Sequence, residues 1–213
     1  MDKRDKLNHP LYCITAEPYS CGRSTLVVVN NMIEAGARII QYREKDKSGR
    51  EKYADCLAIR QMTRDRGVTF IVNDDVDLAL AVVADGVHIG QNDMPIEAVR
   101  ALAGHAMIIG LSTHCPEQAR DAVLRGADYI GVGPLFATAT KKDAGAPVGL
   151  DYLDYVVRNI PVPHVAIGGI KRHNLDEVVR HGARCVALVT EIVGAPDVGV
   201  RVQEIRAFLE RQI

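Results

Sequence analysis

The 213-residue sequence predicts a single (β/α)8 barrel, the TIM-barrel fold of the α/β class, and three observations support this prediction. Eight short apolar runs are spaced along the chain, and stretches with helical character separate them. The runs are continuously apolar, which indicates strands buried on both faces, as in a parallel sheet. No linker or shift in composition marks a second domain, so we assign residues 1–213 to one barrel domain with residues 1–9 as an N-terminal extension. A doubly wound open sheet is the alternative fold.

The strands are expected in a regular order along the chain. They lie near residues 11–15, 37–43, 68–73, 86–89, 107–112, 128–133, 163–168 and 184–190. Five of these runs follow a helical stretch that ends at a glycine, as in EAGARIIQYR and LRGADYIGVG. Glycine just past a helix end adopts the left-handed conformation cheaply, so it closes the helix and turns the chain into the next strand. These glycines are Gly36, Gly67, Gly86, Gly126 and Gly182.

Local signals also place the starts of helices. Ser48 and Glu51 have the spacing of a capping box, ahead of a helix that should run to about Arg66. Pro95 and Pro116 suit the first turn of the helices that follow them.

Composition excludes several classes of protein. Hydrophobic residues make up 47% of the chain and charged residues 25%, as in soluble globular proteins. The formal net charge of -1 gives no reason to expect a nucleic-acid partner. No apolar run reaches the roughly 18 residues that span a bilayer, so no membrane partner is expected. The N-terminal stretch MDKRDKLNHP lacks the apolar region of a secretory signal, which predicts a cytoplasmic protein, and a homo-oligomer is left open.

Polar residues cluster where the predicted strands end. In FIVNDD, an apolar run stops at Asn73, Asp74 and Asp75. The carboxyl ends of the strands form the active-site face of a (β/α)8 barrel, so we expect these polar ends to meet at one mouth. Asp75 is expected to be the N-cap of the third helix, and Asp77 and Asp85 are also expected to be structural.

One part of this mouth suits a diphosphate with a metal ion. Gln41, Arg43 and Lys45 alternate along one strand end, so their side chains should project together, and Arg and Lys bind polyanions. Asp74 and Asp93 follow adjacent strands, and two carboxylates beside bound phosphates are a usual seat for Mg2+. Asp93 has a second interpretation, as a cap for the helix near Pro95.

A second part suits a phosphate monoester. Gly168 and Gly169 expose backbone N–H groups after the seventh strand, beside the loop after the eighth, and these two loops form the common phosphate site of such barrels. The alternative is that the glycines only permit a tight turn. The small, polar segment 134–146 suits a mobile lid, and a plain flexible loop is its other interpretation.

The chain resembles the thiamine phosphate synthase family from near Leu11 to the last helix. The resemblance is carried by QYREKD, IVNDD, GVHIGQND, GLSTH, GPLFATATKKDAGAPVGL, AIGGI and VALVTEI followed by APD. Each motif is short, but their number, order and spacing make the match specific. The resemblance implies a transferase that joins 4-amino-2-methyl-5-hydroxymethylpyrimidine diphosphate to 4-methyl-5-(2-phosphooxyethyl)thiazole, releasing diphosphate by a dissociative route through a pyrimidine methylene cation.

The resemblance also implies roles for individual residues. Gln41 would hold the pyrimidine, and Ser112 would lie close to the leaving oxygen of the diphosphate. The diphosphate would be held by Arg43, Lys45, Asn73 and Lys141. Asp74 and Asp93 would bind one Mg2+ per active site. The thiazole phosphate would be received by Thr138, Thr140, Gly169, Val189 and Thr190. Ser112, Lys141, Arg43 and Lys45 are therefore the catalytic candidates.

Some residues depart from the family pattern. Ala137 and Ala139 stand where the lid often has proline, and Glu191 stands where a small residue is common. We expect Glu191 to face away from the phosphate and Lys142 to face solvent.

Three other functions are the alternatives. A thiazole tautomerase of the same superfamily would resemble the chain poorly at the diphosphate residues. A sugar-phosphate isomerase or epimerase would need a placed acid/base pair. A non-catalytic phosphate-binding barrel should have lost the metal carboxylates or the lid lysine, and Asp74, Asp93 and Lys141 are all present.

Overall fold

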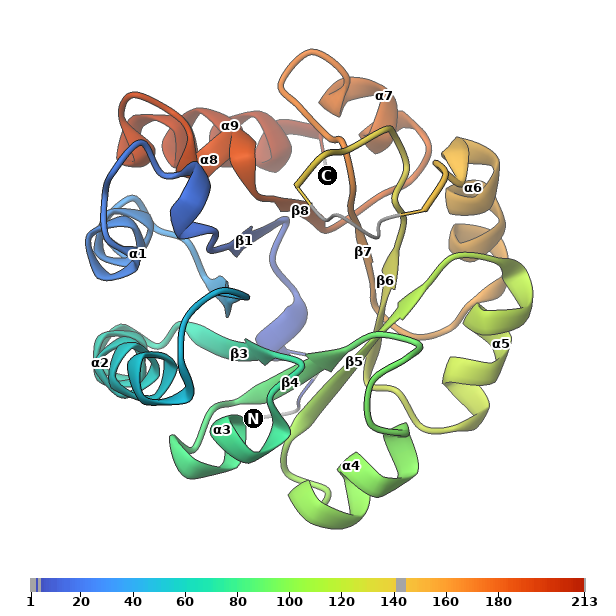
Figure 1. The fold of residues 1–213 in the computed structure, drawn as a ribbon. Helices are drawn as coiled ribbons and strands as arrows, with labels where there is room; N and C mark the ends of the chain where they lie inside the picture. Colours follow the sequence, from blue (N-terminus) through green and yellow to red (C-terminus); the bar gives the residue numbers. More distant parts are fainter. Residues whose placement is uncertain (1–2, 4, 141–144, 213) are drawn as a thin grey trace.

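Eight parallel strands close into a barrel in the computed structural model, which describes residues 3, 5–140 and 145–212. Each strand pairs with its neighbours in the sequence, and the last pairs with the first. The strands are β1 (Leu11–Ile14), β2 (Ile39–Tyr42), β3 (Thr69–Asn73), β4 (Gly86–Ile89), β5 (Ile108–Thr113), β6 (Tyr129–Val132), β7 (His164–Ala166) and β8 (Val186–Leu188). Figure 1 views this barrel along its axis. The predicted (β/α)8 fold is confirmed.

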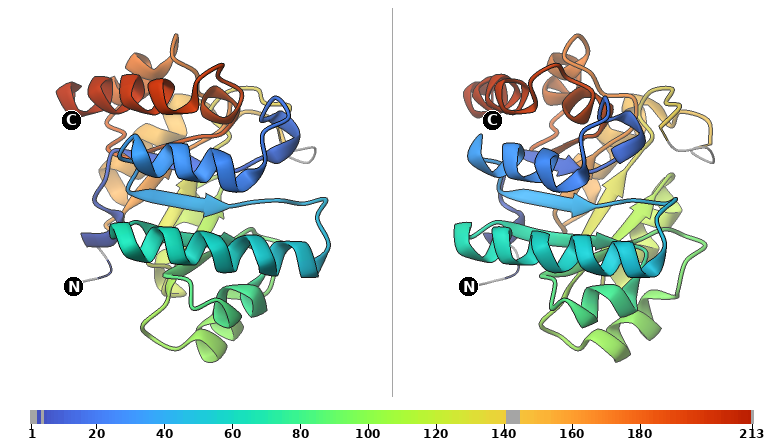
Figure 2. Two further views of the ribbon diagram at one scale, coloured as in Figure 1. Left: turned by 90° about the vertical axis from the view of Figure 1, so that its left-hand side faces the viewer. Right: turned by 60° about the vertical axis from the view of Figure 1, so that its left-hand side comes forward.

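Helices surround the strands (Figures 1 and 2). They are α1 (Thr25–Glu34), α2 (Gly49–Arg66), α3 (Val76–Ala81), α4 (Ile96–Ala103), α5 (Pro116–Leu124), α6 (Gly149–Asn159), α7 (Leu175–Arg180), α8 (Thr190–Val193) and α9 (Val198–Gln212). Two short 3-10 helices, η1 (Asp5–Leu7) and η2 (Glu17–Tyr19), flank β1. In the part of the chain that the structure describes, no helix combines the length and apolarity needed to cross a membrane.

The helix caps follow the sequence signals with one small difference. Ser48 and Glu51 form the predicted capping box at the start of α2. Pro116 is the first residue of α5, as expected. Pro95 lies one position earlier than expected, because it is the N-cap of α4 and not part of its first turn. A proline costs little at such a helix start, because the N–H that it lacks would have no partner within the helix.

Four of the five junction glycines have the predicted left-handed backbone. Gly36, Gly67, Gly126 and Gly182 all have φ between +62° and +90°. The prediction is wrong for Gly86, which is the first residue of β4, while Val83 takes the positive φ of 53° at this junction. Gly86 is needed for close packing instead, because a Cβ there would lie 2.5 Å from the carbonyl oxygen of Ile108.

Two apolar cores lie on the two faces of the barrel wall. Alternate strand residues point to opposite faces, so Ile40 packs outward among the helices while Ile39 points into the barrel. The interior core is small and includes two tyrosines, Tyr12 and Tyr129. This alternation fixes which side chains reach the mouth, since Gln41 shares the inward face of β2 with Ile39.

The end of the barrel opposite the mouth is closed by the N-terminal segment. Leu7 of η1 is buried in the interior core. Lys6 pairs with Asp85 at 2.5 Å, and Lys3 donates to the carbonyl oxygen of Met107 at 2.9 Å. Figure 2 shows that η1 and the end of α9 lie on this side, away from the carboxyl ends of the strands. The termini therefore leave the mouth of the barrel open to ligands.

Candidate active site

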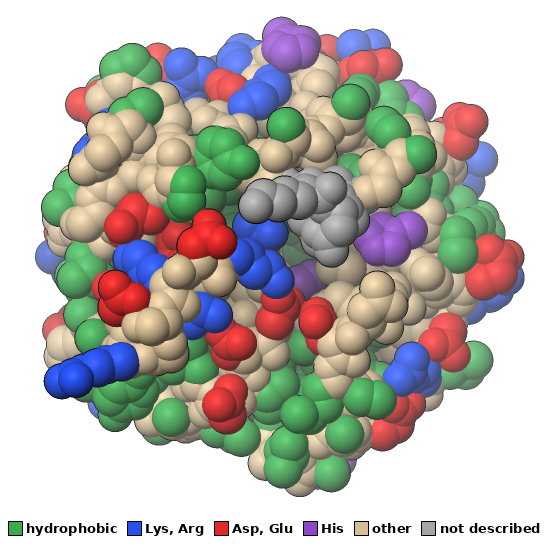
Figure 3. All heavy atoms as spheres, in the orientation of Figure 1, with side chains coloured by type: hydrophobic (Ala, Val, Ile, Leu, Met, Phe, Trp, Pro, Cys, Tyr) green, Lys and Arg blue, Asp and Glu red, His purple; other side chains and the backbone are tan. Residues whose placement is uncertain are grey.

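Charged side chains gather at the mouth of the barrel. Figure 3 shows this face, with Lys and Arg side chains and Asp and Glu side chains around a hollow near its centre. The loops that follow the strands build this region, as the sequence predicts.

Alternate side chains at the end of β2 point into the barrel and away from it. Gln41 is buried, and its Nε2 donates to Tyr12 Oη at 3.0 Å. The main-chain N–H of Arg43 donates to Thr15 Oγ1 at 2.9 Å, which holds this strand end against β1. Glu44 has the opposite orientation, because its carboxylate accepts from the main-chain N–H of Glu17 at 2.9 Å.

Three charged side chains from the ends of β2, β3 and β4 meet at the mouth. Lys45 Nζ contacts Asp74 Oδ2 directly. Burial raises the pKa of Asp74, the Lys45 ammonium opposes this rise, and the neighbouring Asp93 carboxyl adds to it through charge repulsion and a side-chain hydrogen bond. The two carboxyl groups are therefore near neighbours, as the sequence predicts for a metal pair.

The acid pair fits the chemistry of a hard divalent cation. Two adjacent carboxylates repel each other, and a cation between them removes that repulsion. Within residues 3, 5–140 and 145–212, no group of three or more His, Cys, Asp and Glu side chains could hold a metal. A metal ion bound by only two carboxylates has further coordination positions for water and phosphate oxygens, which is the coordination that Mg2+ prefers.

The backbone at the end of β3 supports this arrangement. Asp74 has a positive φ of 61°, which is costly for a residue other than glycine, and its N–H donates to the carbonyl oxygen of His88 at 2.8 Å. Asn73 lies beside it at the end of β3, and both line a small cavity of about 60 Å³ together with Lys45.

Asp93 and Asp75 also have structural contacts. Asp93 Oδ2 accepts from the N–H of Gly90 at 2.6 Å, so it stabilises its own loop and makes no hydrogen bond to a helix N-terminus. Asp75 is the N-cap of α3 by position, as predicted, but its side chain makes no capping hydrogen bond and pairs with Lys52 at 2.8 Å. Asp85 is structural as expected, since it binds Lys6 and Arg60.

Ser112 belongs to a hydrogen-bonded chain that runs through the barrel interior. Its Oγ lies 2.9 Å from His88 Nε2, and His88 Nδ1 lies 2.9 Å from Tyr129 Oη. Tyr129 Oη lies 2.9 Å from Tyr12 Oη, which accepts from Gln41. The chain thus joins two predicted site residues, Gln41 and Ser112, that lie on different strands. The sequence did not indicate the three residues between them.

The loop after β6 packs tightly on the loop after β7. The N–H of Phe136 donates to the carbonyl oxygen of Gly168 at 3.0 Å. A Cβ at Gly169 would lie 2.6 Å from the carbonyl oxygen of Ala137. Glycine is therefore favoured here for two reasons, the close approach of the two loops and the positive φ of 65°. Gly169 is therefore brought next to the segment that carries Thr138 and Thr140, whose hydroxyl oxygens lie 3.3 Å apart.

Lys171 links the loop after β7 to the loop after β8. Its Nζ donates to Thr190 Oγ1 at 2.7 Å and lies 3.8 Å from Glu191. Glu191 also pairs with Arg201 of α9 at 2.6 Å, so its carboxylate lies near two cations. Val189 immediately precedes α8 as its N-cap. The Lys171 ammonium and the Thr190 hydroxyl thus lie together where the sequence predicts a phosphate site, and the Glu191 carboxylate lies near the same ammonium.

Two predicted positions fall outside the described residues. Lys141, a candidate for the diphosphate site, and Lys142, expected to face solvent, both belong to residues 141–144. The described part of the predicted lid reaches across to η2, because Tyr19 Oη donates to the carbonyl oxygen of Ala139 at 3.3 Å.

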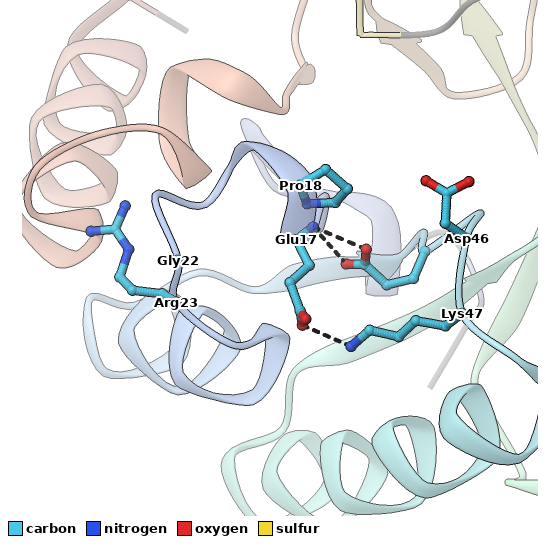
Figure 4. Close-up of a pocket in the computed structure, with 7 residues that line it drawn as sticks. Glu17, Pro18, Gly22, Arg23, Asp46 and Lys47 are labelled. Carbon is cyan, nitrogen blue, oxygen red and sulfur yellow. Dashed lines mark hydrogen bonds and ion pairs between the residues drawn. The ribbon is translucent and has the colours of Figure 1, made fainter.

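A second, wider pocket is formed by the loops that follow β1 and β2. It has a volume of about 440 Å³ and is lined by Glu17, Pro18, Gly22, Arg23, Glu44, Asp46 and Lys47. Figure 4 shows Glu17 and Lys47 pointing toward each other, at 2.7 Å. Arg23 donates to the carbonyl oxygens of Val193, Ala195 and Pro196. Four of the charged side chains that line this pocket, Glu17, Arg23, Glu44 and Lys47, therefore already bind another side chain or the backbone.

Comparisons with known proteins agree on one family. The family model described as thiamine monophosphate synthase matches residues 11–192. The chain is 62% identical over 206 residues to a thiamine-phosphate synthase of Pelotomaculum thermopropionicum, covering 97% of this chain and 94% of the relative. It is 54% identical to a thiamine-phosphate synthase of Lawsonia intracellularis, covering 94% and 92%. A solved structure of thiamine phosphate pyrophosphorylase from Pyrococcus furiosus superposes with a TM-score of 0.90 at 38% identity, covering 100% of both chains.

Proposed function

The chain belongs to the thiamine monophosphate synthase family and is a transferase of thiamine biosynthesis that forms thiamine phosphate, and from this premise we propose how its barrel mouth performs the reaction. Its substrates are small molecules. In our proposal they are the pyrimidine diphosphate and the thiazole phosphate named above, and the enzyme works in the cytoplasm, where such polar metabolites are dissolved. The observation that carries the proposal is the meeting of Lys45, Asp74 and Asp93 at one mouth.

The diphosphate lies, in this proposal, against the ends of β2, β3 and β5. Arg43, Lys45 and Lys141 supply positive charge, and Asn73 and Ser112 supply neutral hydrogen bonds. Asp74 and Asp93 would hold one Mg2+, which would neutralise part of the charge on the diphosphate. Lys45 contacts Asp74 in the structure, so it needs only to turn from that carboxylate to reach a phosphate oxygen bound beside it.

The pyrimidine ring is held by Gln41. Because Gln41 Nε2 is engaged by Tyr12, its Oε1 is the atom that accepts from the exocyclic amino group of the pyrimidine. This contact orients the methylene carbon toward the thiazole. The ring donates electrons to that carbon as the bond to the diphosphate breaks, so the protein needs to supply no nucleophile.

The thiazole phosphate is received between the loops after β6, β7 and β8. Thr138, Thr140, Gly169, Val189 and Thr190 surround it, and we add Lys171, whose ammonium already lies 2.7 Å from Thr190 Oγ1. Placing this anion opposite the diphosphate aligns the thiazole nitrogen with the methylene carbon, and such positioning supplies much of the catalytic effect. In the proposal, residues 134–140 of the predicted lid shield the reacting atoms, which keeps water from capturing the cation.

The proposal is tested by mixing purified protein, Mg2+ and both substrates and measuring thiamine phosphate and diphosphate. We expect both products in equal amounts, and no reaction without Mg2+. Absence of product across a wide range of Mg2+ concentrations would count against the proposed substrates.

A further inference from the structure

The hydrogen bonds between Gln41 and Ser112 inside the barrel can be followed from donor to acceptor in one direction. Gln41 Nε2 can only donate, so Tyr12 Oη accepts from it at 3.0 Å, and among the described residues the acceptor within reach of the Tyr12 O–H is then Tyr129 Oη, at 2.9 Å. In that arrangement Tyr129 Oη accepts the hydrogen bond from Tyr12, and its own O–H donates to His88 Nδ1 at 2.9 Å. A His88 ring that accepts at Nδ1 carries its proton on Nε2, which donates to Ser112 Oγ. The Ser112 O–H proton is then directed away from His88.

The interior is built to hold this chain. Tyr12 and Tyr129 are each 1% exposed, so water does not compete for their hydroxyl groups. Gly110 on β5 makes space for both the tyrosine and the histidine ring, because a Cβ there would lie 2.2 Å from the Tyr129 ring and 2.5 Å from His88 Nδ1. Burial raises the pKa of both tyrosines, so both hydroxyl groups stay protonated and can donate hydrogen bonds along the chain. A buried polar chain of this kind is costly unless every member has a partner.

We propose that Tyr129 is a positioning residue: with Tyr12, it holds the proton of His88 on Nε2, so that the Ser112 hydroxyl donates to the leaving oxygen of the diphosphate. The inference rests on the proposed function for the role of Ser112. It goes beyond that function by assigning a task to two tyrosines that lie beneath the substrates. It also links the pyrimidine contact at Gln41 to the donor at Ser112 through a defined set of hydrogen bonds.

The first test measures the tautomer of His88 and needs no substrate. Nitrogen NMR of 15N-histidine-labelled protein at one fixed pH distinguishes a ring protonated on Nε2 from one protonated on Nδ1. We expect the Nε2–H form in the wild type and a mixture of the two forms in Tyr129→Phe, which removes the hydroxyl and keeps the ring. A wild-type ring protonated on Nδ1, or an unchanged ring in a folded Tyr129→Phe variant, would overturn the proposal.

The second test separates kcat from KM. Since Ser112 acts on the leaving oxygen in the transition state, Tyr129→Phe should lower kcat about tenfold while both KM values stay within about twofold. The matched control is Tyr152→Phe, because Tyr152 is also buried and its hydroxyl donates at 2.7 Å to Thr113, next to Ser112 but on the outer face of β5. This control should leave both kcat and the His88 spectrum unchanged.

Tyr12→Phe provides a second variant in case Tyr129→Phe does not fold. It leaves Tyr129 in contact with His88 but removes the acceptor of Gln41, so we expect a smaller loss of kcat and a partial change of the His88 spectrum. An unchanged kcat in both folded variants would contradict the inference. Failure of the wild type to form thiamine phosphate would instead contradict the proposed function, and the NMR result would still decide the direction of the chain.

Discussion

Lys45 and Asp74 are in direct contact at the mouth of the barrel, where the ammonium of one strand end meets the carboxylate of the next. Asp74 interacts both with this cation and with the carboxyl group of Asp93. The same three side chains would surround a diphosphate and its metal ion, so their meeting is the geometric basis of the account.

Replacing Asp93 by alanine should lower kcat on the order of 100-fold, because the site loses half of the pair that we propose to hold the metal ion. Stability should fall by only about 1 kcal/mol, since the structural role of the side chain is to accept one hydrogen bond from Gly90. Steady-state kinetics and urea unfolding measure the two effects. Asp77→Ala, an exposed carboxylate of α3, is the matched control. Unchanged turnover in Asp93→Ala would show that Asp93 only shapes its loop.

Lys171→Gln should raise the KM for the thiazole phosphate about tenfold, since one charge-assisted hydrogen bond to the phosphate is worth on the order of 1.5 kcal/mol. The KM for the pyrimidine diphosphate should stay the same, which is the internal control. Titration calorimetry with each substrate measures the two affinities. Equal loss of affinity for both substrates would mean that Lys171 serves the fold and not the phosphate.

Lys141→Ala should abolish most of the activity while binding of the thiazole phosphate is largely kept, because we assign Lys141 to the diphosphate. Calorimetry and turnover measurements together test this assignment. Loss of thiazole phosphate binding with activity kept at high substrate concentration would remove Lys141 from the diphosphate site.

Glu17 should make stability depend on pH in acid. Burial raises its pKa, but hydrogen bonds from Lys47 and Thr25 outweigh this and lower the pKa to about 2. The folded pKa is below the unfolded value, so the stabilisation is present above about pH 4.5 and is lost as the pH falls toward 2. Glu17→Gln should therefore cost about 1 kcal/mol at pH 7, a value reduced for the partial exposure of the side chain, and almost nothing near pH 2. A constant difference across this range would contradict the ion pair as its source.

The sequence predicted the barrel and the gathering of polar strand ends at one mouth because both follow from local order. Helix caps, junction glycines and strand-end motifs are read along the chain, and closure of the barrel then brings the strand ends together. The prediction for Gly86 was wrong because this glycine allows β4 to pack closely against Ile108 of β5. A contact between two strands leaves no local pattern in the sequence.

The contacts that the sequence did not predict join residues far apart in the chain. Tyr12 and Tyr129 meet only because β1 and β6 face each other across the barrel interior. In sequence they are two aromatic residues in apolar strands, which indicates only a core. Lys171 looks like an ordinary loop lysine until β8 places Thr190 within 2.7 Å of its ammonium.

The central claim is most directly tested by a crystal structure of the protein with Mg2+, diphosphate and thiamine phosphate. The account predicts the metal ion between the Asp74 and Asp93 carboxylates, the diphosphate against Arg43 and Lys45, and the thiamine phosphate monoester beside Lys171 and Thr190. Diphosphate and metal bound elsewhere, such as in the 440 Å³ pocket beside Glu17 and Lys47, would contradict it.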